Sequence, residues 1–352
     1  GRCVTMGLTD TADERRRKAV KYGKVPYVDK PVSRIVLGTS LPPIQTGLGG
    51  GKLLDSMTDL GINCLDTARV YGHSEQTLGR WMKKRGNRER LVILSKGGHP
   101  DSNGTKRISE KEIRRDLETS LKALGTDRID IYVLHRDDPE VPAGSIVEML
   151  NALHREGKIC AFGGSNWTHE RLEEANGYAE AHGLIPMTVS SPNFSLARQV
   201  TDPWGGGCVC ISGVDAEAAQ AWYREKQMAV FSYSSLGRGF LSGKVRGDDE
   251  TSGAKVLDAY ARKGFDAPEN YERLRRCETL AREKGVTVPQ LAVAWLFHQG
   301  IDEYAVISSS SPERMRDNLA ALELELTEAE NDYLNLETDE REGVNVPLSP
   351  LP

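Results

Sequence analysis

Eight short apolar segments alternate with amphipathic segments along most of this chain, and this alternation restricts the possible folds more than any other feature. A short apolar run between turn residues indicates a buried strand, whereas a longer segment with a helical period indicates a surface helix. Several amphipathic segments start at a capping residue, as at Ser109 and Thr168, and end on glycine, as at Gly61, Gly125 and Gly183. The expected strands are 33–38, 62–66, 91–96, 129–135, 159–165, 187–191, 228–234 and 304–309, and the expected helices include 52–61, 74–86, 109–125, 145–158, 168–183 and 288–300.

Strands that alternate with helices are expected to be parallel neighbours, because a parallel connection needs a crossover. With eight such units and right-handed crossovers, we predict an α/β fold, a single-domain (β/α)8 TIM barrel. Two segments, 196–227 and 242–271, are too long for ordinary connections, and the first contains a glycine-rich run unsuited to a helix. We expect both to be insertions in the loops that follow strands. The predicted division is an N-terminal extension at 1–30, a catalytic domain at 31–335 and a C-terminal tail at 336–352.

Composition and charge exclude several classes of partner. The net charge is -5 and no segment is strongly basic, which argues against nucleic acid or an anionic membrane surface as the partner. No apolar run reaches the roughly 20 residues of a membrane span, and the N-terminus lacks a signal-peptide pattern. The six cysteines show no disulfide framework, and Cys208 and Cys210 stand without a second ligand cluster. We therefore expect a cytoplasmic protein with reduced thiols and no bound metal, and we leave the residues before Met6 out of the fold prediction.

Three of the expected strands end on an ionisable residue, namely Asp66, Lys96 and His135. In a parallel barrel the carboxyl ends of neighbouring strands meet on one face, and Tyr71 reaches that face from the loop after Asp66. A lysine cation lowers the pKa of a phenol, a carboxylate keeps a buried lysine charged, and histidine adds an orienting hydrogen bond. The set therefore suits protonation of a carbonyl oxygen. Singly, each residue also fits a helix cap, a solvated turn or a structural histidine. Arg69, in the same loop, is expected to form a salt bridge.

The segments that carry these residues resemble the strand-end motifs of the aldo-keto reductases. They are "LDTARVYG", "LVILSKGG", "YVLHRDDP" and "FGGSNW", and they occur in the family's order within 32–322, nearly the whole chain. The resemblance implies a (β/α)8 fold, reduction of carbonyl compounds with NAD(P)H and a catalytic tetrad. By motif, the implied tetrad is Asp66, Tyr71, Lys96 and His135, with Tyr71 as the general acid.

A dinucleotide fingerprint of the Rossmann type is absent, because the glycine-rich run at 47–52 follows no strand. The resemblance instead implies a cofactor site on later strand ends. Ser165 and Asn166 would hold the nicotinamide carboxamide, with Ser191 where the family usually has glutamine, and Tyr233 would stack on the ring. The other implied cofactor residues are Gly38, Thr39 and Asp66 on the early strands, Ser234, Leu236, Gly237, Arg238 and Lys244 around the diphosphate, and Ser308, Ser309, Ser310, Arg314, Asp317 and Asn318 at the adenosine end.

The adenosine end also bears on the choice of cofactor. Arg314 would face the ribose 2′-phosphate, so NADP(H) is favoured over NAD(H), although Ser308 stands where many members have lysine. Physically, the segment after Tyr233 combines glycines, hydroxyls and cations that suit a diphosphate. Apart from the resemblance, that segment also fits a flexible surface loop, and the segment after Ser308 fits an ordinary helix start.

Polar and aromatic groups are expected at the mouth of the site, namely Arg136, Asp137, Asp138, Trp167 and Trp204. They suit a hydroxylated carbonyl compound, such as a keto-sugar, better than a bare alkyl aldehyde. We predict an oxidoreductase that moves hydride between NADP(H) and a small carbonyl or hydroxyl substrate, as a monomer or small homo-oligomer.

Two other functions compete with this prediction. The first is a nucleotide-binding regulatory subunit with little turnover, similar to potassium-channel β subunits, which share the implied fold. Such a subunit would present a large apolar partner surface. The second is a metal-dependent barrel hydrolase or isomerase, which needs several histidines and aspartates at strand ends. The sequence places one histidine there, at His135.

Overall fold

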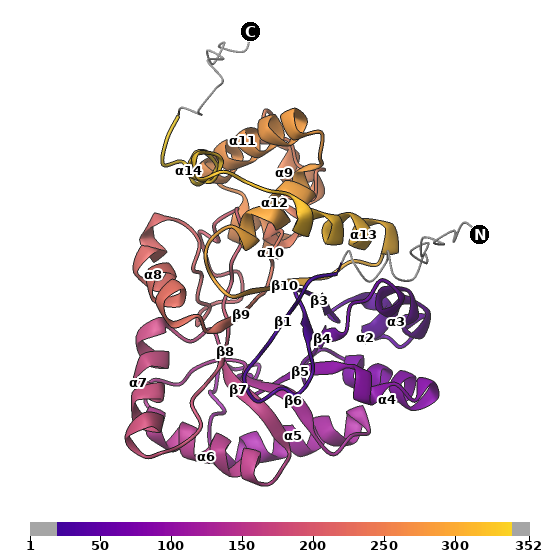
Figure 1. The fold of residues 1–352 in the computed structure, drawn as a ribbon, viewed down its shortest axis with the longest axis vertical. Coiled ribbons are helices and arrows are strands. Elements are labelled where there is room, and N and C mark those ends of the chain that lie inside the picture. The colour runs from indigo at the N-terminus through magenta and orange to yellow at the C-terminus, as the bar shows by residue number, and fades with distance from the viewer. Residues whose placement is uncertain (1–19, 340–352) are drawn as a thin grey trace, which may run out of the picture.

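Residues 20–339 are described in the computed structural model, and they form a closed barrel of eight parallel strands surrounded by helices (Figure 1). Each expected strand is present, so the predicted (β/α)8 barrel is confirmed. The strands follow chain order around the barrel, and the last pairs with the first. They are β3 (Ile35–Gly38), β4 (Cys64–Asp66), β5 (Val92–Gly97), β6 (Ile129–Leu134), β7 (Ile159–Ser165), β8 (Val189–Ser191), β9 (Ala229–Ser232) and β10 (Glu303–Ile307).

Helices cover the outside of the barrel and start at the capping residues that the sequence predicts. The side chains of Ser109 and Thr168 each accept a hydrogen bond from a backbone N–H in the first turn of the helix they precede. The helices are α2 (Pro42–Gln45), α3 (Gly50–Asp59), α4 (Ser74–Arg85), α5 (Glu110–Leu124), α6 (Ala143–Arg155), α7 (His169–Ala181), α8 (Glu217–Lys226), α9 (Ser252–Val256), α10 (Ala259–Phe265), α11 (Pro268–Lys284), α12 (Val288–Phe297), α13 (Pro312–Ala320) and α14 (Glu328–Asn335), with 3-10 turns η1 (Arg88–Arg90), η2 (Val214–Ala216), η3 (Gly237–Gly239) and η4 (Ala321–Glu323).

The register of the early strands brings their carboxyl ends together. Asp66 pairs with Gly38 on one side and with Leu94 on the other. Lys96 pairs with Val133, two residues before His135. Three ionisable side chains from three consecutive strands therefore reach the same end of the barrel, as their positions at strand ends predict.

The core has two layers. Inside the barrel, apolar side chains from the strands pack against one another, and the Phe231 and Tyr304 rings stack with centroids 4.6 Å apart. Between barrel and helices lies the larger layer, which includes Leu54 and Ile113 from the first helices. Alternation of side chains along each strand supplies both layers, so the barrel interior is a packed core and not a pore.

A short hairpin closes the amino end of the barrel. It pairs β1 (Tyr22–Gly23) with β2 (Val32–Ser33) in antiparallel fashion, and Val25 in its loop joins the inner core. A larger residue at position 23 would displace its neighbours, because a β-carbon there would lie 2.2 Å from the Tyr304 hydroxyl. The predicted N-terminal extension at 1–30 thus carries part of this hairpin. Residues 1–19 of that extension and residues 340–352 of the predicted C-terminal tail lie outside the described residues.

The two expected insertions follow β8 and β9 and meet at the carboxyl end of the barrel. The glycine-rich part of the first contains no helix, as predicted, but its last residues form α8. The second contains α9 and α10 and the start of α11. Trp204 of the first insertion stacks on Tyr260 of the second, with ring centroids 6.4 Å apart. The insertions therefore build one wall over the strand ends.

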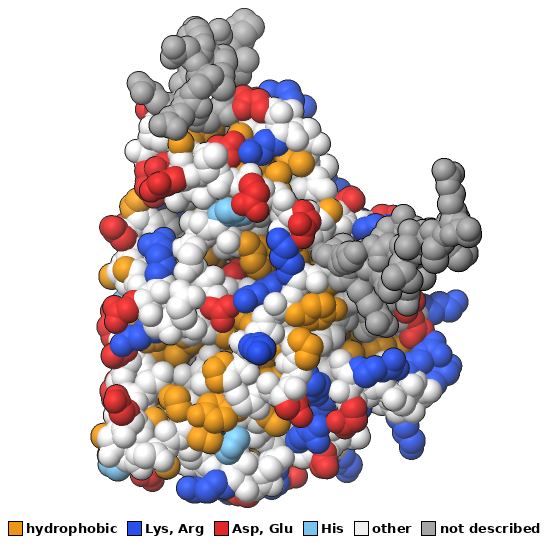
Figure 2. Space-filling model, in the orientation of Figure 1, with side chains coloured by type: hydrophobic (Ala, Val, Ile, Leu, Met, Phe, Trp, Pro, Cys, Tyr) orange, Lys and Arg blue, Asp and Glu red, His pale blue; other side chains and the backbone are white. Residues whose placement is uncertain are grey.

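The surface carries both signs of charge. Lys and Arg side chains alternate with Asp and Glu across the face drawn in Figure 2, and no single-sign field dominates it. Within the described residues, no helix has the length and apolar character needed to cross a membrane.

Candidate functional site

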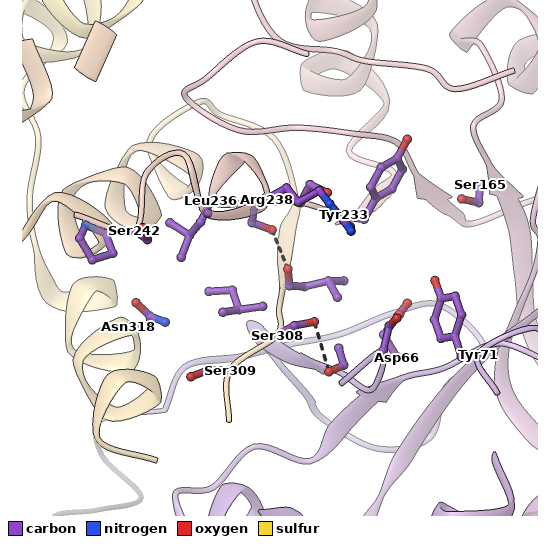
Figure 3. Close-up of a pocket in the computed structure, with 18 of the residues that line it drawn as sticks. Asp66, Tyr71, Ser165, Tyr233, Leu236, Arg238, Ser242, Ser308, Ser309 and Asn318 are labelled. Atoms are coloured by element: carbon purple, nitrogen blue, oxygen red, sulfur yellow. Dashed lines mark hydrogen bonds between the residues drawn. The ribbon is translucent and has the colours of Figure 1, made fainter. Parts of the chain in front are cut away.

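A cavity of about 1020 Å³ opens at the carboxyl ends of the barrel strands. It is elongated, with Asp66 and Tyr71 at one end and Ser309 and Asn318 at the other (Figure 3). This volume suits a ligand of dinucleotide size together with a small molecule. The predicted residues that line it are Gly38, Asp66, Tyr71, Lys96, His135, Arg136, Ser165, Asn166, Trp204, Tyr233, Ser234, Leu236, Arg238, Ser308, Ser309, Arg314, Asp317 and Asn318.

Lys96 and Asp66 form a buried ion pair at the base of the cavity. Lys96 Nζ donates to Asp66 Oδ2 at 2.6 Å and to the Thr67 carbonyl oxygen at 3.0 Å. Burial raises the pKa of Asp66, and the Lys96 cation partly reverses this effect. Burial lowers the pKa of Lys96, but Asp66 and Tyr71 outweigh it, so the pKa lies above its usual value. The lysine is therefore charged at neutral pH.

Tyr71 lies against this pair on the loop after β4. Lys96 Nζ is 5.0 Å from the centroid of the Tyr71 ring. Burial raises the pKa of the phenol, and Lys96 lowers it again in part, so the net pKa lies above the usual value. The sequence predicts only the effect of the lysine. The structure adds the larger effect of burial, which keeps the phenol protonated at neutral pH.

His135 forms the opposite side of the cluster. Its ring meets the Tyr71 ring edge to face, with centroids 5.9 Å apart. Burial, together with the neighbouring cations, places the pKa of His135 well below its usual value. The imidazole is therefore neutral near pH 7. The His135 side chain lines the cavity, and its Nδ1 atom is buried without a hydrogen-bond partner among the described side chains and backbone.

Arg69 anchors the loop after β4, which carries Tyr71, to helix α5. Its Nε lies 2.9 Å from Asp116 Oδ1 of α5, which confirms the expected salt bridge. Asp116 is almost fully buried and also accepts two hydrogen bonds from Arg107 and one from the backbone N–H of Gly98. These contacts tie the loops after β4 and β5 to one helix, and so fix the position from which Tyr71 faces the cavity.

The predicted nicotinamide residues lie close together, but their polar groups already bond to one another. Ser165 Oγ donates to the Ser191 carbonyl at 2.9 Å, and Tyr233 donates its hydroxyl proton to Asn166 Oδ1 at 2.7 Å. Asn166 adopts a left-handed backbone conformation with φ of 59°. Ser191 is buried behind Ser165 and does not reach the cavity, although its own Oγ has no partner within 20–339.

Two arginines mark the far part of the cavity. Arg238 forms two hydrogen bonds with Asp258, at 3.2 and 3.0 Å, and lies over the rings of Trp204 and Tyr260. Arg314, in the first turn of α13, is exposed and takes part in no ion pair within the described chain. Arg238 is thus paired with a carboxylate in the described chain, whereas Arg314 is not.

Six predicted residues lie away from the cavity, and two more, Asp137 and Asp138, also do not line it. Trp167 is fully buried beneath Gly164, where an added β-carbon would lie 2.4 Å from the indole, so the expected substrate contact is not formed. Asp137 and Asp138 lie close to the mouth, but they pair with Arg171 and Lys106. The six are the buried Thr39, Trp167, Ser191 and Gly237 and the exposed Lys244 and Ser310.

Several residues that line the cavity were not predicted from the sequence. His99 lines the cavity, with its ring centroid 4.8 Å from that of His135, although it lies in an irregular loop rather than at a strand end. Ser242 lines the far part, and its buried Oγ has no partner among residues 20–339. Thr287, Val288 and Pro289 enter from the start of α12. The adjacent "SKGG" motif could have pointed to His99, and Ser242 lies in the segment after Tyr233 that the sequence assigns to a diphosphate, whereas no local signal marks the residues from α12.

Metal ligation is not suggested by the described part of the chain, where no three His, Cys, Asp or Glu side chains are grouped to hold an ion. Cys208 and Cys210 are free thiols.

Comparison with known proteins gives a consistent family match. The model of the Aldo/keto reductase family matches residues 51–336. A putative aryl-alcohol dehydrogenase of Schizosaccharomyces pombe is 30% identical over 313 residues, which cover 80% of this chain and 83% of the relative. An aldo-keto reductase of the same yeast, named with NADP(+), is 28% identical over 79% of this chain and 78% of its own length. A putative voltage-gated potassium channel subunit beta, also from this yeast, is 28% identical over 75% and 76%.

Proposed function

The chain belongs to the aldo/keto reductase family, and we propose that it is an oxidoreductase that transfers hydride between NADP(H) and a carbonyl or alcohol substrate. The proposal rests on the cluster of Asp66, Lys96, Tyr71 and His135 at one end of the cavity. We assign the activity to a catalytic domain at 31–335.

Each member of the cluster has a distinct role in the proposal. Tyr71 donates a proton to the carbonyl oxygen of the substrate, since its raised pKa keeps the phenol protonated. Lys96 stabilises the phenolate that remains after proton donation, and Asp66 holds Lys96 in place. His135, which is neutral, orients the substrate oxygen through a hydrogen bond.

The cavity walls fit a phosphorylated nicotinamide dinucleotide, which supplies the hydride when bound. Ser242 Oγ is a buried polar atom that lacks a protein partner in the described region, so it is available to a ligand. Arg238 would bind the diphosphate and Arg314 the 2′-phosphate, because guanidinium groups match phosphate geometry. Ser309 and Asn318 would hold the adenosine. We therefore propose NADP(H) in preference to NAD(H).

Substitution of Tyr71 by phenylalanine tests the mechanism. We expect Tyr71→Phe to lower kcat for carbonyl reduction by about 100- to 10,000-fold, the range for loss of a general acid. The affinity for NADPH, measured by fluorescence titration, should stay within about twofold, because the ring remains and only the hydroxyl is removed. Full turnover by this variant would show that another group donates the proton.

A regulatory subunit is the competing function, because one relative is named a potassium channel subunit beta. A carbonyl panel with NADPH separates the two. Tight NADPH binding with no turnover of aldehydes, ketones, sugars or steroids would favour the regulatory role.

A further inference from the structure

The mouth of the cavity carries a guanidinium group without a carboxylate partner. Arg136 follows His135 and lines the cavity, and the ion pairs formed within residues 20–339 do not include it. A half-buried charge normally keeps a partner of opposite sign, because removal from water is costly. This arginine therefore has guanidinium N–H groups that no carboxylate of the described chain binds directly.

Neutral groups hold Arg136 in place. Its Nη1 donates to the His135 carbonyl oxygen at 2.8 Å, and its Nη2 lies 3.4 Å from Cys208 Sγ. Gly207 packs against the side chain, since a β-carbon at this glycine would lie 3.5 Å from Arg136 Cδ. Burial raises the pKa of Cys208 to about 11, so this group is an uncharged thiol at neutral pH. The guanidinium is fixed by neutral groups, and its five N–H donors exceed these two contacts.

The carboxylates nearest in sequence are engaged elsewhere. Asp137 Oδ2 accepts from Arg171 Nε at 3.1 Å, and Asp138 Oδ1 accepts from Lys106 Nζ at 2.9 Å. Neither carboxylate lines the cavity. Both groups belong to the set that the sequence predicts at the mouth for a hydroxylated carbonyl compound, so that set is incomplete in the cavity.

The carboxylate of Asp202, in the neighbouring insertion, interacts with the charge of Arg136 from a distance but forms no direct ion pair with it among the described residues. Asp202 accepts the backbone N–H of Trp204 at 2.8 Å and that of Cys208 at 2.9 Å. The same loop is anchored to the barrel, because Asn166 Oδ1 accepts the N–H of Val209 at 3.0 Å. The segment that packs on Arg136 is thus fixed by its own hydrogen bonds.

Arg136 lies near enough to the proposed proton donor to act on it. Burial raises the pKa of Tyr71, and Arg136 is among the cations that lower it again. Arg136 also adjoins His135, whose ring meets that of Tyr71. One short molecule could therefore contact the guanidinium with one end and the phenol with the other.

We propose that Arg136 binds a carboxylate of the substrate, so that the preferred substrates are short aldehydes or ketones that carry a carboxylate, such as ω-oxo acids. The planar guanidinium matches a carboxylate through two parallel hydrogen bonds, and the pairing supplies the direct carboxylate partner that the described chain does not. This inference rests on the proposed reductase function and adds a substrate class to it. The carboxylate is unchanged in the reaction: the carbonyl carbon gains hydride from NADPH, the oxygen gains a proton from Tyr71, and a hydroxy acid and NADP+ form.

A pair of substrates that differ only in charge tests the inference. The full chain is assayed at saturating NADPH with succinic semialdehyde and with methyl 4-oxobutanoate, its uncharged ester. We expect kcat/KM to favour the acid by about tenfold or more, the effect of a hydrogen bond to a charged group. Arg136→Gln should bring this ratio near one, mainly through KM, whereas Arg136→Lys should retain part of it. Arg80→Gln, on α4 outside the cavity, is the matched control and should keep the wild-type ratio.

A binding measurement gives a readout that does not depend on turnover. Succinate should bind to the NADP+-loaded protein, as measured by calorimetry, and should bind at least about tenfold more weakly to Arg136→Gln. Succinamide should not distinguish the two proteins. If acid and ester are reduced equally well and succinate binds both proteins alike, the carboxylate site is refuted while the reductase function stands. If no carbonyl in a broad panel is reduced, the proposed function itself fails, and the substrate class with it.

Discussion

The two ends of the barrel bury carboxyl groups in opposite ways. At the carboxyl end, Asp66 meets Lys96 at 2.6 Å and borders an open cavity. At the amino end, Glu303 of β10 accepts a hydrogen bond from Ser232 and belongs to no ion pair in the described chain. Its second carboxylate oxygen is buried and has no partner within that range. Both groups are nearly inaccessible to solvent, with exposed fractions of 5% and 1%.

The comparison teaches what a buried carboxyl needs if it is to stay charged. Burial raises the pKa of both, but Lys96 opposes this at Asp66, whereas Glu303 reaches a pKa of about 8. Glu303 is therefore mostly protonated at neutral pH. A carboxylate that holds a lysine can support chemistry at the cavity, whereas an isolated one can only donate or accept a hydrogen bond.

The largest effect on stability and activity is expected from Lys96→Met. This variant would leave a buried carboxyl group without a cation at the carboxyl end of the barrel, as Glu303 is at the amino end. Asp66 would be left buried without a cation, which costs about 3–5 kcal/mol of unfolding free energy. Carbonyl reduction should fall by at least about 100-fold, because the Tyr71 phenolate loses its support. Denaturant unfolding and steady-state kinetics measure the two effects. Lys106→Met, at an exposed ion pair, is the control and should change neither by much.

The Glu303→Gln variant tests the other end. The native state keeps its proton up to a pKa of about 8, whereas the unfolded chain releases it near 4.5. Stability is therefore lost as pH rises from 4.5 to 8, because the unfolded state binds fewer protons over this window. The variant removes this loss of stability. Its unfolding free energy should exceed that of the wild type by up to about 3 kcal/mol at pH 7 and should not exceed it below pH 4.

Chemical denaturation at several pH values measures the difference. Glu225→Gln, at an exposed site on α8, is the matched control and should leave the unfolding free energy nearly unchanged. An equal gain for Glu303→Gln at pH 4 and pH 7 would show that Glu303 does not titrate as its burial indicates.

A smaller loss of activity is expected from a change at Asp116, because this residue is buried outside the cavity and affects Tyr71 only through Arg69. Asp116→Asn weakens the link between α5 and Arg69, so the Tyr71 loop should shift slightly. Misplacement of a reacting group costs up to about 100-fold, and we expect about a tenfold loss of kcat with unchanged NADPH affinity. Glu118→Gln, exposed on the same helix, should keep full activity. Loss of NADPH binding in Asp116→Asn would point to general unfolding instead of loop placement.

The smallest effect is expected at Arg314, an exposed arginine that forms no ion pair in the described chain, and it concerns the affinity for the cofactor. Arg314→Ala should raise the Kd for NADPH about fivefold and leave the Kd for NADH within about twofold, because only NADPH carries the 2′-phosphate. Fluorescence titration at two salt concentrations measures this, and Arg316→Ala on the same helix is the control. Equal weakening of both nucleotides would assign Arg314 to another part of the cofactor.

Much of the fold follows from the sequence, because local patterns are sufficient for it. The eight apolar runs predict the eight strands, and caps such as Ser109 predict where helices begin. The meeting of Asp66, Lys96 and His135 also follows, since each ends a strand and parallel strands of a barrel align their carboxyl ends. These properties were determined by the sequence alone, because they depend on neighbours in the chain and on a regular topology.

The tertiary structure decided which polar groups are available in the cavity. Trp167 follows β7 closely in sequence, yet it packs under the strand, and Asp137 and Asp138 are taken by cations from distant segments. The direction of the Tyr71 pKa shift also depends on burial that no motif records. Arg136 forms no direct ion pair in the described chain, because Asp137 and Asp138 pair with other cations and Asp202 accepts backbone N–H groups. Such outcomes arise from packing between remote segments, where the environment of a side chain is set by neighbours that the local sequence does not contain.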